Sequence, residues 1–137
     1  QKLDSGTQLV ILHAVWGIGM AARKDVSKLV FLKTALDSKD DEVLAQTAKV
    51  IGDLGTSSSE YKDELIKGLS HKSDRVKFFS AIALGNGKVM EASKKLVQFV
   101  EEDGSKDPYL RHAGSMSFSG TMSRSSRTPT KIIRCRA

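Results

Sequence analysis

The fold is decided by residues 37–69, DSKDDEVLAQTAKVIGDLGTSSSEYKDELIKGL, because their pattern recurs on both sides at a spacing of 33 residues. Alignment in steps of 33 groups Val10, Val43, Val76 and Tyr109; Ala14, Thr47, Ser80 and Ala113; Ile18, Ile51 and Leu84; and Gly19, Gly52 and Gly85. Such a period is typical of stacked helix pairs. The sequence therefore predicts an all-α fold, a right-handed α-α superhelix of about three and a half helical hairpins.

Within this central unit, the acidic run 40–42 is expected to begin a helix, where the macrodipole favours negative charge. The predicted inner stripe of that helix is Val43, Thr47, Val50, Ile51 and Leu54. Gly55 stands where a left-handed residue ends a helix, and residues 56–59 are expected to form the loop before a second helix that runs to Leu69.

The neighbouring units are residues 4–36 and 70–102. In the first, Asp4 offers an N-cap, and the predicted core face of the helix comprises Val10, Ala14, Gly17 and Ile18. Residues 26–36 describe a second amphipathic helix. Each of these units is therefore expected to be one helical hairpin.

A fourth unit, residues 103–118, is incomplete. Asp107 caps it, Pro108 takes the first helical position, and Tyr109, Ala113 and Met116 are expected to continue the inner stripe. Six serines follow between positions 115 and 126, with too few apolar residues for a second helix. We therefore predict a repeat domain over 1–118 and a basic Ser/Thr/Arg-rich tail over 119–137 that is disordered or not native.

Composition and charge indicate a soluble globular or solenoid protein, with 39% hydrophobic and 28% charged residues. The formal net charge is +6, but residues 1–102 account for only +1 and residues 103–137 for +5. The basicity belongs to the tail, which argues against a nucleic-acid partner for the repeat body.

No membrane partner is expected. The longest mainly apolar run, 9–22, is interrupted by His13 and is shorter than the roughly 20 residues that a spanning helix needs. The chain begins at Gln1, so a leader or an upstream domain can have been removed. A single cysteine, Cys135, excludes an internal disulfide framework and a multi-cysteine metal cage.

The histidines do not predict a metal site or a catalytic base. His13 and His112 occupy the same column three units apart, too far to share a metal ion, and His71 stands at a turn beside Lys72. We therefore expect no enzyme activity, no cofactor and no metal.

Lysines recur on the predicted second helices and form a candidate partner-binding strip: Lys28, Lys33, Lys62, Lys67 and Lys95. If those helices line a concave surface, the strip presents weak positive charge to an acidic partner. Acidic residues lie on the same helices, so the competing interpretation is an ordinary solvated face with i,i+4 pairs.

Two helix centres carry a family resemblance: VIGDLG at 50–55 and AIALG at 81–85. They resemble the Ala-Leu-Gly-x-Leu-Gly centre of short bacterial HEAT repeats over roughly residues 4–118. Ankyrin repeats have a similar period, but their Thr-Pro-Leu-His start is missing here. The resemblance implies an armadillo-like helical repeat that binds proteins.

Two further phrases, HAVWGIG at 13–19 and DPYLRHAG at 107–114, resemble the HEAT segment of large bacterial dehydrogenase-like proteins. In those proteins a β-propeller precedes the repeats and a c-type haem domain follows. The resemblance implies a periplasmic spacer or docking scaffold between redox domains. It transfers no catalytic residue, because the sequence contains neither the propeller nor a Cys-x-x-Cys-His motif.

The sequence thus favours a non-enzymatic protein-interaction scaffold or interdomain spacer, a fragment of a larger multidomain protein. Its partners are expected to be another protein or flanking domains, and both apolar ends of the array are expected to self-associate. Two alternatives stay open. One is a chromophore-lyase-like protein that holds a tetrapyrrole, and the other is a DNA-binding HEAT array, which only the basic tail supports.

Overall fold

The computed structural model describes residues 4–121; residues 1–3 and 122–137 lie outside the described part. Within it, 80% of the residues are helical and none lies in a strand, so the expected all-α class is confirmed. The elements are α1 (Ser5–Ala22), η1 (Val26–Leu32), α2 (Lys33–Leu36), α3 (Asp41–Gly52), η2 (Gly55–Tyr61), α4 (Lys62–Gly68), α5 (Asp74–Asn86), η3 (Met90–Ala92), α6 (Ser93–Glu102) and α7 (Pro108–Thr121), where η marks a 3₁₀ helix.

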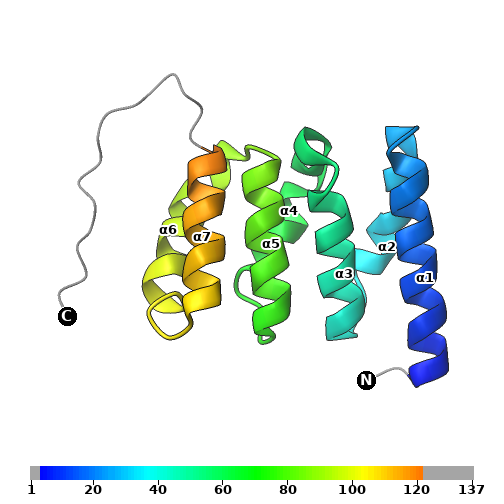
Figure 1. The fold of residues 1–137 in the computed structure, drawn as a ribbon, viewed down its shortest axis with the longest axis horizontal. Helices are drawn as coiled ribbons and strands as arrows, with labels where there is room; N and C mark the ends of the chain where they lie inside the picture. Colours follow the sequence, from blue (N-terminus) through cyan, green and yellow to red (C-terminus); the bar gives the residue numbers. More distant parts are fainter. Residues whose placement is uncertain (1–3, 122–137) are drawn as a thin grey trace.

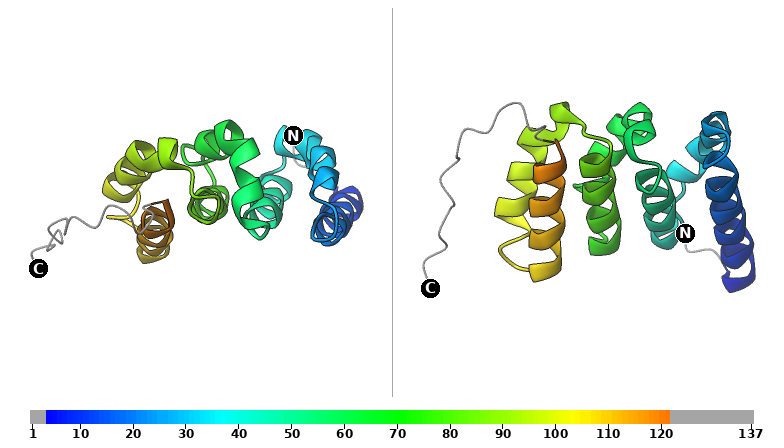
Figure 2. Two further views of the ribbon diagram at one scale, coloured as in Figure 1. Left: turned by 90° about the horizontal axis from the view of Figure 1, so that it is seen from above. Right: turned by 45° about the horizontal axis from the view of Figure 1, so that its top comes forward.

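The helices form two rows. The long helices α1, α3, α5 and α7 stand side by side and run in the same direction, so that their N-terminal ends share one edge (Figure 1). The shorter α2, α4 and α6 form the second row behind them (Figure 2). Each long helix therefore pairs with the short element that follows it, except α7, whose successor falls outside the described residues.

Three predicted aspartate caps are present. The carboxylate of Asp4 accepts a hydrogen bond from the backbone N–H of Thr7 at 3.0 Å, and that of Asp107 accepts one from Tyr109 at 2.7 Å. Asp40 caps α3 in the same way. These bonds satisfy backbone donors that the helix cannot satisfy itself, so they fix where the long helices begin.

The second-row elements begin as 3₁₀ helices, which the sequence did not predict. The first hairpin returns through η1 before one short α-helix, and η2 replaces the loop expected at 56–59. In η1, Leu29 and Leu32 are both buried, and a spacing of three places them on one face of a 3₁₀ helix. Gly55 has φ of +63°, which confirms its left-handed conformation.

Three glycines at the predicted spacing of 33 let the long helices approach closely. A Cβ atom at Gly52 would lie 2.9 Å from the Cα of Ala83 on α5. A Cβ at Gly19 would collide with Val50, and one at Gly85 would collide with the backbone of Ser117. Each glycine therefore faces the next long helix in the row.

The inner stripes of α3 and α5 lie where the sequence places them. Val43, Thr47 and Ile51 are buried on α3, and Val76 and Leu84 are buried on α5. A continuous core of apolar side chains runs between the two rows from α1 to α7. Burial of these side chains supplies most of the stabilisation that the hairpins share.

The predicted core face of α1 is wrong. Its buried residues are Leu12, Val15, Gly19 and Ala22, whereas Val10 is 71% exposed. The column prediction assumes that every long helix has a neighbour on both sides. In the described part of the chain α1 packs against α3 and its own η1, so the side that carries Val10 is uncovered.

In α7 the predicted register is wrong by one residue. Leu110 is buried, whereas Tyr109 and Met116 are 77% and 56% exposed. The longer connection 103–107 before α7 shifts the helix relative to the 33-residue column.

The predicted domain boundary at residue 118 is also corrected, because α7 continues to Thr121. Ser117 and Thr121 are buried, and Gly120 faces the backbone of Gly85. These small residues are packing contacts of α7 on α5 rather than the start of a tail. The rest of the predicted tail, 122–137, lies outside the described residues.

Helix α1 is also long and apolar enough to cross a membrane, judged by length and composition alone. The sequence estimate began at residue 9, but the helix begins at Ser5 and contains 18 residues. Only 22% of it is buried. Core helices and N-terminal signal sequences meet the same criterion, so this finding is weak evidence for a span.

Candidate functional site

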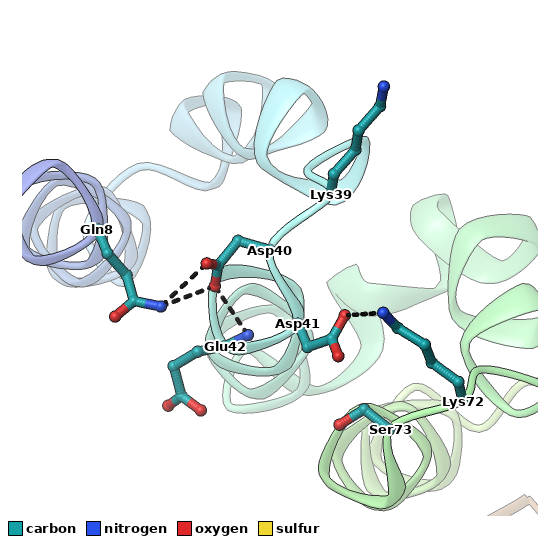
Figure 3. A pocket seen from close by; sticks show the side chains of 7 residues that line it. All are labelled: Gln8, Lys39, Asp40, Asp41, Glu42, Lys72 and Ser73. Atoms are coloured by element: carbon teal, nitrogen blue, oxygen red, sulfur yellow. Dashed lines mark hydrogen bonds and ion pairs between the residues drawn. The ribbon is translucent and has the colours of Figure 1, made fainter. Parts of the chain in front are cut away.

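A polar groove runs along the edge where α1, α3 and α5 begin (Figure 3). It has a volume of about 560 Å³. Its lining is predominantly charged: Gln8, Lys39, Asp40, Asp41, Glu42, Lys72 and Ser73. Because the three long helices are parallel, their positive dipole ends converge here and favour the acidic residues. We name these seven residues the N-terminal groove.

Asp40 is the central residue of the N-terminal groove and is only 4% exposed. One carboxylate oxygen accepts hydrogen bonds from the backbone N–H groups of Glu42 at 3.0 Å and Val43 at 3.2 Å. The side-chain amide of Gln8 donates to both oxygens, at 2.9 and 3.0 Å (Figure 3). Asp40 therefore caps α3 and joins it to α1.

The other two carboxylates of the groove face the third hairpin. Lys72 lies 3.5 Å from an oxygen of Asp41, and the guanidinium of Arg75 lies 3.1 Å from Glu42. Glu42 also accepts a hydrogen bond from Gln46 at 2.8 Å. The acidic run 40–42 thus links the hairpin that precedes it to the hairpin that follows it.

The groove can offer charge and hydrogen bonds to a partner at its rim. Lys39 is exposed and points away from the carboxylates (Figure 3). Among residues 4–121, no group of three or more His, Asp, Glu or Cys residues is arranged to hold a metal ion. The groove therefore reads as a contact between hairpins with a charged outer rim.

The structure places the predicted lysine strip on the second row, as expected. Lys28 lies in η1, Lys33 in α2, Lys62 and Lys67 in α4, and Lys95 in α6. Two of the five are paired: Lys28 with Asp25 at 3.3 Å, and Lys62 with Glu91 at 2.9 Å. The hydrogen bond between the latter two raises the pKa of Lys62 and lowers the pKa of Glu91.

The surroundings of the strip are mixed in charge. Lys33 shares a shallow cavity of about 360 Å³ with Glu60 and Glu64. Lys95 lines another with Glu102 and Asp103. The lysines are thus interspersed with carboxylates, which favours the solvated-face interpretation over a continuous basic surface.

The three histidines lie apart. His13 is exposed on α1, with its ring 5.5 Å from that of Trp16. His112 is exposed on α7. His71 is half-buried at the turn before α5, where its Nδ1 accepts a hydrogen bond from the backbone N–H of Ser73 at 3.1 Å.

Sequence reasoning missed the polar contacts between hairpins. Gln8 and Asp40 are 32 residues apart, and Trp16 donates to Gln46 across 30 residues at 3.3 Å. Lys77 binds Asp103 at 2.9 Å, and this hydrogen bond raises the pKa of Lys77. Only the near-33 separation hints at such pairs, because equivalent helices are neighbours in space.

Replacement of Asp40 by alanine is expected to lower the free energy of unfolding by about 2 kcal/mol, because the α3 cap is lost and Gln8 loses its acceptor. Urea titration followed by circular dichroism measures the change. Asp41→Ala is the matched control and should cost within about 0.5 kcal/mol, since its ion pairs are partly exposed. Equal losses for the two variants would contradict the assigned role of Asp40.

No family model, no curated protein and no solved structure matches this chain.

Proposed function

We propose that this chain is a HEAT-like α-solenoid that serves as a non-enzymatic scaffold for protein contacts. The observation that carries the proposal is the glycine column. Gly19, Gly52 and Gly85 recur at 33 residues, and each contacts the next long helix near the end of its own helix. One contact repeated along a row of hairpins is the packing rule of a solenoid.

The site geometry supports a binding role. In the N-terminal groove, the carboxylates of Asp40, Asp41 and Glu42 are each bound to a cap, an amide or a cation from a neighbouring hairpin. Groups held in this way stabilise the array, and a general acid or base needs instead to be within reach of a substrate proton. What the array presents outward is an extended surface along both rows, which solenoids use to bind other proteins.

The resemblance to the HEAT segment of bacterial dehydrogenase-like proteins narrows this proposal. The two phrases that carry it, residues 13–19 and 107–114, lie in the middle of α1 and at the start of α7. These are the two outermost long helices in Figure 1. Phrases at the two ends of the array support a spacer between flanking domains, which are then its first partners.

Ligand titrations of the chain 1–137 test the proposal against its rivals. We expect a chelator to leave the far-ultraviolet circular dichroism unchanged, haemin to keep its free absorbance spectrum, and duplex DNA binding to vanish when residues 122–137 are removed. A saturable one-to-one shift of the haemin spectrum would replace the scaffold by a tetrapyrrole carrier. Salt-dependent DNA binding by residues 1–121 would replace it by a nucleic-acid-binding array.

A further inference from the structure

We propose that α1 is a homodimer interface, in which the outer face of α1 packs antiparallel against the same face of a second copy of the chain. This face points away from α3 and is apolar: Leu9 is 54% exposed, and Val10 and Met20 are each 71% exposed. Between Asp4 and Arg23, helix α1 carries no Asp, Glu, Lys or Arg. An uncharged apolar face of this kind is typical of interaction sites.

Gly17 gives the face a second, independent peculiarity. A glycine inside a helix lowers its stability by about 1 kcal/mol relative to alanine. Gly19 compensates for this cost by its close contact with Val50, but no atom lies within 4 Å of the position that a Cβ of Gly17 would take. A gap in the side chains of the outer face is explained if another helix approaches there.

Charge complementarity selects a second copy in antiparallel orientation. Asp4 and Arg23 flank α1 at equal distances from its centre, and neither has an ion pair in the described part of the chain. When two copies of α1 are antiparallel and centred on one another, Asp4 of each copy lies beside Arg23 of the other. The same register places Val10 over the gap at Gly17 and opposes the two helix dipoles.

The opposite end of the array lacks these features. The outer face of α7 presents Arg111, His112, Ser115 and Ser119, all exposed. The expectation of two self-associating ends is therefore narrowed to one. A bilayer is also a poorer occupant than a second copy, because 18 residues span about 27 Å and the hydrocarbon core is about 30 Å thick.

The first experiment measures mass by light scattering across a wide range of protein concentration. We expect the chain 1–137 to shift from the mass of one chain to that of two as concentration rises. Val10→Glu should stay a monomer with an unchanged melting temperature, because position 10 is exposed in the single chain. Met116→Glu, a matched change of an exposed apolar residue on α7, should dimerise like the original chain.

The second experiment tests orientation by oxidative cross-linking in a Cys135→Ser background. Ala14→Cys lies near the centre of α1 and should cross-link to itself. Thr7→Cys and Met20→Cys should each fail alone, because like positions would lie about 20 Å apart, but they should cross-link when mixed. Cross-linking of Thr7→Cys to itself would show a parallel dimer and overturn the proposal.

The third measurement is flotation with phosphatidylcholine vesicles. A chain that is monomeric at every concentration, but floats with vesicles unless Val10 is replaced by Glu, would show that a membrane covers this face and would overturn the dimer. Monomers that ignore vesicles would overturn it as well. These outcomes are independent of the scaffold proposal, since the haemin and DNA titrations do not depend on α1 pairing.

Discussion

Replacing Gly85 with alanine is expected to destabilise the fold by about 3 kcal/mol or more, because the new methyl group has no space. A Cβ at this position would lie 2.9 Å from the Cβ of Ser117 and 3.1 Å from its carbonyl oxygen, and closer still to its Cα. These are backbone-bound atoms of a buried helix, which no change of side-chain rotamer can move. Helix α7 must therefore shift away from α5.

The measurement is the free energy of unfolding in urea, followed by far-ultraviolet circular dichroism at low protein concentration. Gly17→Ala is the matched control, because nothing lies within 4 Å of its Cβ position. Relieved of the glycine penalty, that variant should be more stable by up to about 1 kcal/mol. The glycine-contact explanation fails if the two variants change stability in the same direction.

Replacing Ile51 with aspartate is expected to abolish the cooperative fold. Ile51 is fully buried on α3, between α1 and α5 in the row of long helices. Loss of its side chain alone costs about 2–5 kcal/mol, and an unpaired buried carboxylate adds a desolvation penalty. A domain of this size has about 5–15 kcal/mol of stability in total, so most of it is removed.

The Ile51→Asp variant should show reduced helical ellipticity and no sigmoidal melting transition. Asp53→Ala is the control two residues away. Asp53 is exposed and forms an ion pair with Lys49 at 3.0 Å, so its loss should cost no more than about 0.5 kcal/mol. A sharp transition in Ile51→Asp would mean that the hairpins around α3 fold without it.

The sequence predicts the long helices well because their signals are local or strictly periodic. Aspartate caps at Asp4, Asp40 and Asp107 mark where helices begin, and each needs only its own next turn. The column of Gly19, Gly52 and Gly85 repeats at a fixed interval, and every member meets the same neighbour type. Periodicity is informative wherever each hairpin has the same surroundings.

The same reasoning fails where the surroundings change. Val10 occupies the column of the buried Val43 but has no neighbour on its side among the described residues, so it is exposed. A lengthened connection shifts α7 by one residue and exchanges Tyr109 for Leu110. Serine-rich composition concealed a packed helix end, because Ser117 is small enough for the contact that Gly85 requires.

The N-terminal groove could be predicted only in part. The acidic run 40–42 was recognisable as a helix start, because negative charge at that position has a local cause. The partners of these carboxylates come from other hairpins: Gln8 from α1 and Arg75 from α5. Long-range pairs of this kind leave no trace in the local pattern of a single sequence.

The two rows differ mechanically because their contacts differ in kind. Along the long helices, neighbours touch through glycine backbone, which neither salt nor side-chain motion can loosen. Along the second row, the bridge between Lys62 and Glu91 joins side chains that are 40% and 66% exposed, and dissolved ions screen such a pair. The protein is therefore stiff along one edge and compliant along the other. A bending load opens the second row first, and ionic strength sets how readily it yields.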